Sequence, residues 1–310
     1  MSGSSGARMF GLLLLVLGGG AAVYAAWSLG GYTSPTPALA AAGGSATRLH
    51  EAAGKGDADT IKLELTRGAD VNARQAEVGP DKGLTPLLVA VRAGQPGAAQ
   101  ALIAGKANVN TPAGDGDTPL MAAAQAGDGA IVKALIDAGA NANSRNEAGM
   151  TALMLASTRG AVDCMQMIVA AGADIESRSK WRETALMIAA RSGDPESLKV
   201  LLNAGASVDA VNLDNQSVLA LAVAAGTSPE VLTLLIGRGA KVDAPDNEGV
   251  TPLMKAAELG NIAAVKALLT AGASKAAKDR GGRNAALWAA NRGDDVGKEI
   301  AALTAEQAGK

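Results

Sequence analysis

GDTPLMAAAQAG, residues 116–127, returns along the chain at a spacing of 33 or 34 residues. Its later copies are GMTALMLASTRG (149–160), RETALMIAARSG (182–193), NQSVLALAVAAG (215–226) and GVTPLMKAAELG (249–260). A fixed period of this length is typical of repeat architectures, in which each repeat is one supersecondary unit. The repeat therefore decides the fold before any single residue is considered.

Each copy predicts a short helix with defined ends. The Thr or Ser at its third position caps the helix by accepting from free backbone N–H groups. Pro at the next position, as in Pro119, fits the first helical turn. Gly127 and its equivalents suit the left-handed conformation that ends many helices. The capping residues are Thr85, Thr118, Thr151, Thr184, Ser217 and Thr251.

A second amphipathic helix is expected after each of these, as in AIVKALIDAG (130–139). It is followed by a second recurring block. The copies of this block are KANVN (106–110), GANAN (139–143), GADIE (172–176), GASVD (205–209), GAKVD (239–243) and GASKA (272–276). One such unit cannot bury its own apolar face, so its stability has to come from stacking on its neighbours.

The two blocks together resemble the ankyrin repeat family, whose motif runs D-x-x-G-x-T-P-L-H-x-A-A-x-x-G and then G-A-D-V-N-A. The resemblance covers residues 46–303. It implies an all-α solenoid of about eight helix-turn-helix units with hairpin-like loops. The first unit starts near Thr47, and the last, from Asn284, lacks the second block.

Several conspicuous residues have a structural explanation in this register. The resemblance implies that His50, the single histidine, bonds to neighbouring backbone. The free Cys164 and a methionine stripe suit apolar packing. Four aspartates are interpreted as turn formers that satisfy backbone N–H groups. The stripe is Met121, Met154, Met187 and Met254, and the aspartates are Asp70, Asp174, Asp209 and Asp243.

Composition and motifs disfavour nucleic-acid binding, metal binding and catalysis. The net charge of −2 argues against a nucleic-acid surface. One Cys and one His leave no cluster with metal-ligand spacing. The sequence shows no Gly-rich phosphate loop and no nucleophile with an obvious base. We therefore expect no enzyme, no cofactor and no metal site.

A separate segment precedes the repeats. MFGLLLLVLGGGAAVYAAWSL, residues 9–29, carries no charge and would span about 31 Å as a helix, close to the thickness of a bilayer core. Arg8 on its N-terminal side predicts, by the positive-inside rule, that the repeats are exported. The alternative is a signal peptide cleaved near Ala40 to Ala42.

These segments define the expected domains. They are a cytoplasmic stub (1–8), a transmembrane helix or signal sequence (9–30), a flexible Pro/Gly/Ala linker (31–45), the repeat domain (46–303) and a C-terminal tail (304–310). We expect a monomeric repeat domain on the periplasmic or extracytoplasmic side of the inner (plasma) membrane, or a secreted or periplasmic soluble protein after cleavage. The Ala- and Gly-rich composition makes a bacterial source plausible.

The expected function is a scaffold for protein–protein interaction, with a partner that the sequence does not name. The resemblance implies that partners bind the concave face formed by the loop tips and the first helices. On this sequence the selected positions are Met150, Arg159, Lys180, Trp181, Arg182, Glu183, Arg191, Leu213 and Asp214.

SRSKWRET, residues 177–184, is the most distinctive of the loops, because Trp181 stands between two basic residues. An exposed Trp beside Lys and Arg has the composition of an interface hot spot. The alternative is that the ring lies flat over the adjacent tip, covering Met150 or Leu213. Arg182 replaces the family's loop Gly, which predicts a less regular and more basic tip. Trp288, in the last unit, is expected to be a cap residue.

Overall fold

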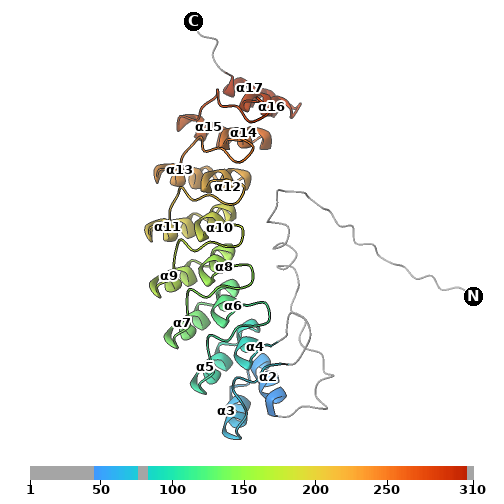
Figure 1. Ribbon diagram of the computed structural model, residues 1–310, viewed down its shortest axis with the longest axis vertical. Coiled ribbons are helices and arrows are strands. Elements are labelled where there is room, and N and C mark those ends of the chain that lie inside the picture. Colours follow the sequence, from blue (N-terminus) through green and yellow to red (C-terminus); the bar gives the residue numbers. More distant parts are fainter. Residues whose placement is uncertain (1–44, 76–82, 306–310) are drawn as a thin grey trace, which may run out of the picture. The chain divides into compact units, whose positions relative to one another are not determined.

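The structure is a computed structural model that describes residues 45–75 and 83–305. In this part the chain forms eight consecutive helix pairs, called units one to eight here, and no β-strand (Figure 1). The first helices are α2 (Ser45–Lys55), α4 (Pro86–Arg92), α6 (Pro119–Ala126), α8 (Ala152–Arg159), α10 (Ala185–Ser192), α12 (Val218–Ala224), α14 (Pro252–Leu259) and α16 (Ala285–Ala290). The second helices are α3 (Ala58–Thr66), α5 (Pro96–Ala104), α7 (Gly129–Asp137), α9 (Val162–Ala170), α11 (Pro195–Asn203), α13 (Pro229–Gly237), α15 (Ile262–Thr270) and α17 (Asp295–Thr304). The all-α prediction is confirmed for the described residues.

The helix boundaries follow the predicted caps. Thr118 accepts a hydrogen bond from the Met121 backbone N–H, and every predicted capping residue makes the equivalent bond. Gly127 then ends α6 in the left-handed conformation, with φ 75°. The same ending recurs at Gly160, Gly193 and Gly260. Local capping chemistry therefore fixes where the first helices begin and end.

The helices form two rows that run through the units (Figure 1). Each first helix packs against its own second helix and against the first helices of the adjacent units. The first helices bury most of their leucines, and they bury the methionine stripe almost completely, which confirms that the stripe is core. His50 is buried and its Nε2 lies 3.1 Å from the carbonyl O of Leu84, so its predicted bond to neighbouring backbone is confirmed.

Side chains at the end of the second block join successive units. Asn143 accepts from the Asp174 N–H at 2.7 Å and donates through Nδ2 to the carbonyl of Gly172 at 3.1 Å. Asn110 makes the same two bonds to the turn that follows α7 in the third unit. These contacts satisfy exposed backbone groups in the next unit while the helices bury the apolar surface.

The prediction for the four aspartates was right for two of them. Asp70 and Asp174 each accept from the N–H two residues ahead, as turn formers do. Asp243 instead accepts from the Ser274 N–H of the next unit at 2.9 Å, and Asp209 pairs with Lys241 at 3.5 Å. The predicted acceptance from a backbone N–H is thus confirmed for Asp243, but in the next unit. The turn-forming role failed for Asp209 and Asp243, because they stand two residues later in the block.

The predicted stub, the apolar segment 9–30 and most of the linker lie outside the described residues. No helix in the ranges 45–75 and 83–305 is long and apolar enough to cross a membrane. The linker was predicted to reach residue 45, but Ser45 already belongs to α2. Likewise α17 continues to Thr304, the first residue of the predicted tail.

Candidate functional site: the loop tips between units four and six

The loop tips before units four to eight are each shaped by one short polar side chain. In the tip before unit five, Ser179 Oγ accepts from the N–H groups of Trp181 and Glu183, both at 3.2 Å. Asn212 does the same in the next tip, for Asp214 and Gln216. Side chains of this kind stabilise tight turns by replacing backbone acceptors. The tips are therefore defined structures on which side chains have fixed positions.

Backbone hydrogen bonds connect each tip to the one before it. The Lys180 N–H donates to the carbonyl of Ala148 at 3.0 Å, and the Leu213 N–H donates to the carbonyl of Trp181 at 3.1 Å. The Asn247 N–H donates to Asp214 in the same way at 3.0 Å. This ladder holds neighbouring tips side by side, so residues from two tips can form one surface.

Arg182 keeps its tip regular, contrary to the sequence prediction. It adopts φ 60°, the left-handed conformation that Gly149 and Gly249 adopt in the equivalent places. Its N–H donates to the Ser179 carbonyl at 2.9 Å, as the N–H of Gly149 does to Asn146. The bonds around it impose a conformation that costs a non-glycine residue about 1 kcal/mol or more. The second half of the prediction stands, since the exposed Arg182 side chain makes this tip more basic.

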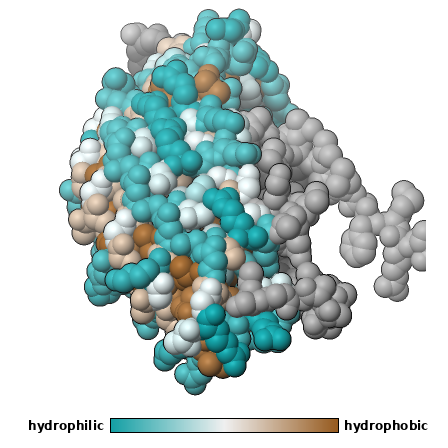
Figure 2. All heavy atoms as spheres, turned by 60° about the horizontal axis from the view of Figure 1, so that its bottom comes forward, coloured by the Kyte–Doolittle hydropathy of each residue, from teal (hydrophilic) through white to brown (hydrophobic). Residues whose placement is uncertain are grey.

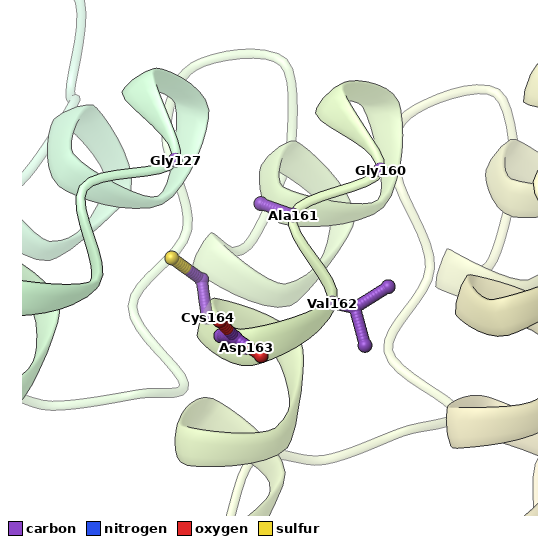
Figure 3. Close-up of a pocket in the computed structure, with 6 residues that line it drawn as sticks. All are labelled: Gly127, Gly160, Ala161, Val162, Asp163 and Cys164. Carbon is purple, nitrogen blue, oxygen red and sulfur yellow. The ribbon is translucent and has the colours of Figure 1, made fainter.

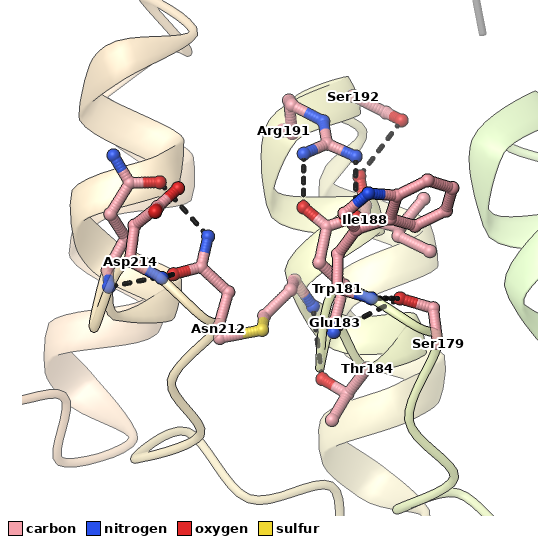
Figure 4. A network of polar contacts seen from close by, with 11 residues as sticks. Ser179, Trp181, Glu183, Thr184, Ile188, Arg191, Ser192, Asn212 and Asp214 are labelled. Carbon is pink, nitrogen blue, oxygen red and sulfur yellow. Dashed lines mark hydrogen bonds and ion pairs between the residues drawn. The ribbon is translucent and has the colours of Figure 1, made fainter. Parts of the chain in front are cut away.

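Glu183 and Arg191 form the strongest polar contact at the tip (Figure 4). The two Arg191 nitrogens donate to the two carboxylate oxygens at 2.6 and 3.2 Å. Arg–carboxylate pairs with two parallel bonds are stronger and more specific than single contacts. Figure 4 shows the Trp181 indole on the same side of the loop as this pair, while Asp214 lies on the neighbouring tip.

The structure places most of the predicted site residues together, with two exceptions. Lys180, Trp181, Arg182, Glu183 and Arg191 share the fifth unit and its tip, and Leu213 and Asp214 occupy the adjacent tip. Met150 is only 3% exposed, so its side chain belongs to the core and offers no surface to a partner. Arg159 is exposed, but its stem leans over Gly127, toward the third unit.

Trp181 lies between the two alternatives that the sequence left open. It is half-buried, and its carbonyl and N–H groups are both engaged in the tip hydrogen bonds. Leu213 beside it remains 54% exposed, so the ring does not cover it.

Trp288 is also half-buried. Its Nε1 donates to Asp279 at 3.0 Å and the Arg283 guanidinium lies 4.3 Å from the centre of its ring.

Sequence reasoning missed the polar contacts that stabilise other tips. Asn146 Nδ2 donates to Asp117 at 2.8 Å, across two tips. Burial raises the pKa of Asp117, and the hydrogen bond from Asn146 opposes that rise. Arg92 reaches from α4 to Asp115 at 3.0 Å. The signal was available in the repeat register, because Asp117 occupies the position of Glu183 and Asp115 that of Trp181.

Other features of the described residues offer no chemical site. No group of three or more His, Cys, Asp or Glu residues there could hold a metal ion.

A shallow hollow of about 340 Å³ is lined by the turn from Gly160 to Cys164 and by Gly127. Figure 3 shows the Cys164 sulfur directed toward the third unit. Burial raises the pKa of this thiol, which keeps it protonated at neutral pH. The prediction that Cys164 is a buried small residue is confirmed.

Comparisons with known proteins agree with this geometry. A family model of three ankyrin repeat copies matches residues 49–146, 87–179, 126–212 and 219–307. Among solved structures, the crystal structure of the human ASB11 ankyrin repeat domain is similar, with a TM-score of 0.63 and 29% sequence identity. The match covers 72% of this chain and 96% of that domain. The search of curated proteins finds no match.

Proposed function

The chain belongs to the ankyrin repeat family, and from this premise we propose that it is a membrane-tethered adaptor whose loop tips hold a protein partner. Ankyrin repeats are a protein–protein interaction fold, and their members are generally non-enzymatic scaffolds. The observation that carries the proposal is the surface at units five and six. There Trp181, Leu213, Lys180 and Arg182 are presented by two tips that hydrogen bonds hold together.

The energetic argument rests on the chemistry of these side chains. Interface energy concentrates in a few residues, among which Trp and Arg are over-represented. A rigid tip reduces the entropy that these side chains lose on binding. In the described residues after His50, Trp181 and Trp288 are the two aromatic side chains, and Trp288 is occupied by contacts within its own unit. Trp181 stands between the exposed Lys180 and Arg182 on the proposed surface, so we assign it as the aromatic anchor for the partner.

The tether is proposed from the apolar segment 9–30 and the Pro/Gly/Ala linker that follows it. A single uncleaved anchor would keep the repeats at the outer surface of the inner membrane. A second candidate is a soluble exported inhibitor or effector, favoured if the small residues near Ala40 to Ala42 form a cleavage site. Sequencing the N-terminus of the mature protein decides between them. A start near Ala41 or Gly43 would exclude the anchor.

The binding proposal is tested by affinity capture of cross-linked partners from native membranes with Trp181→Ala and Trp288→Ala. Both changes remove a half-buried Trp, but the second lies outside the proposed surface. We expect Trp181→Ala to reduce recovery of a specific protein about tenfold or more, as loss of a hot-spot residue does. We expect Trp288→Ala to leave recovery unchanged. Circular dichroism checks that both variants remain folded. Equal recovery with wild type and Trp181→Ala would contradict the proposal.

A further inference from the structure

The equivalence of the repeats shows which side chains meet across two tips. Arg280 and Glu248 lie on adjacent tips and form an ion pair at 3.7 Å, beneath a backbone bond from the Arg280 N–H to the Glu248 carbonyl at 2.9 Å. Leu213 and Trp181 occupy the same two positions two units earlier, and the same backbone bond joins them. Trp181 and Leu213 therefore stand on adjacent tips joined by a backbone bond, and the 54% exposure of Leu213 adds apolar surface to the half-buried Trp181.

The basic residues beside this apolar pair have no acidic counterpart. Lys180 occupies the position of Arg280, but the residue facing it is Ala148 instead of a glutamate. Neither Lys180 nor Arg182 forms an ion pair with any residue in the described ranges, and both are exposed. Glu183, the nearest carboxylate in the chain, is engaged by Arg191. Lys180 and Arg182 therefore stand beside Trp181 and Leu213 without an ion-pair partner among the described residues.

The charges on the neighbouring loops limit the positive electrostatic potential of Lys180 and Arg182 to one tip. The guanidinium groups of Arg145 and Arg178 donate to backbone carbonyls of the following loop, so they belong to the scaffold. Exposed carboxylates stand on both adjacent tips, at Glu147 before and Asp214 after. The positive potential is thus confined to one tip. A nucleic-acid strand running over several tips would meet these carboxylates, which repel phosphate groups.

We propose that the partner presents an acidic segment of polypeptide to this tip. Resting on the proposed function, the inference adds the partner's chemistry: an apolar side chain packs on Trp181 and Leu213, and flanking carboxylates pair with Lys180 and Arg182. The apolar contact supplies most of the affinity, because a central, desolvated anchor dominates interface energy. The rim charges supply selectivity and faster association, both of which weaken with salt.

The test selects random twelve-residue peptides on phage against the full chain in detergent micelles and scores each clone against Trp181→Ala. We expect clones that depend on Trp181 to be enriched in Asp and Glu next to a large apolar residue. A synthetic peptide of the consensus sequence is then titrated by fluorescence anisotropy. The double variant Lys180→Glu/Arg182→Glu should bind this peptide at least about tenfold more weakly. Raising the NaCl concentration should weaken the binding of the peptide to the wild type.

Lys106→Glu is the matched control. Lys106 is also an exposed basic residue in the left-handed conformation, with φ 66°, but it follows α5, in the turn of a different unit. Its charge reversal should leave the peptide affinity unchanged within about twofold. Clones that depend on Trp181 without acidic enrichment, or that bind the double variant equally well, would overturn this inference and leave the adaptor proposal standing. A selection without any clone dependent on Trp181 would also overturn it, and the membrane capture would then decide separately whether a partner binds.

Discussion

At the scale of the residue, Arg182 combines a local cost with a proposed use. Its left-handed backbone is held by the tip, and its side chain is exposed for contact. We expect Arg182→Gly to raise the free energy of unfolding by up to about 1 kcal/mol, because Gly adopts this conformation without steric penalty. Urea denaturation measures the change. Lys106→Gly, at φ 66°, should stabilise similarly. Only Arg182→Gly should weaken partner binding, and a loss of stability would show that the Arg182 side chain supports the tip.

The ionisation of Asp279 contributes to the stability of the last unit. Desolvation disfavours its charged form, but hydrogen bonds from Arg283 and Trp288 outweigh this and hold the pKa of Asp279 below its usual value near 3.8. A carboxyl with a lowered pKa in the folded state contributes stability that is present above the unfolded value. That contribution is lost as the pH falls through the folded value.

We therefore expect Asp279→Asn to lower the melting temperature of the chain at pH 7, and the difference from wild type to shrink as the pH falls below 3.8. Thermal melts from pH 2 to pH 7 measure this dependence. Trp288→Phe removes one hydrogen-bond donor to the Asp279 carboxylate, so its melting temperature at pH 7 should lie between those of wild type and Asp279→Asn. A difference that is constant across this pH range would rule out ionisation of Asp279 as the cause.

At the scale of the element, units are joined by side chains that bridge their turns as well as by helix packing. Asn143 both accepts from Asp174 and donates to Gly172. We expect Asn143→Ala to lower the free energy of unfolding by about 1–2 kcal/mol, the net value of two exposed hydrogen bonds. Asn143→Asp keeps the acceptor and should cost about half as much. Guanidinium denaturation gives both values, and equal losses would show that the Oδ1 acceptor contributes nothing.

The same elements show what sequence could and could not predict. Thr118 and Gly127 were predicted correctly because capping depends on a few adjacent residues. The side chain just before the capping residue was less predictable, because its burial depends on whether a polar partner lies across from it. Met150 lies in the core, whereas the Glu183 side chain at the same position, only 13% exposed, is held by its ion pair with Arg191. The Arg182 conformation was missed because its cause lies in Ser179 and in the tip bonds.

At the scale of the whole repeat array, the helices that pack most extensively on one another belong to the same unit or to adjacent units. Stability should then be a sum of unit and interface terms, with the end units weakest. Large apolar side chains exposed at both ends are consistent with this, with Leu63 in α3 and Leu287 in α16 each about half exposed. Figure 2, with the α3 end forward, shows hydrophobic residues gathered in the lower part of a mostly hydrophilic face.

This arrangement predicts that damage spreads only to adjacent units. Trp288→Ala should accelerate amide exchange in α16 and α17 and, more weakly, in α14 and α15, while α8 and α9 stay protected. Leu186→Ala, at a fully buried position in α10, should cost about 2–5 kcal/mol and accelerate exchange in the units on both sides. Hydrogen exchange with mass spectrometry resolves these segments. Uniform acceleration in the Trp288→Ala variant would mean that the repeats unfold as one block, since separate unit and interface terms cannot transmit the loss of one terminal contact across the whole array.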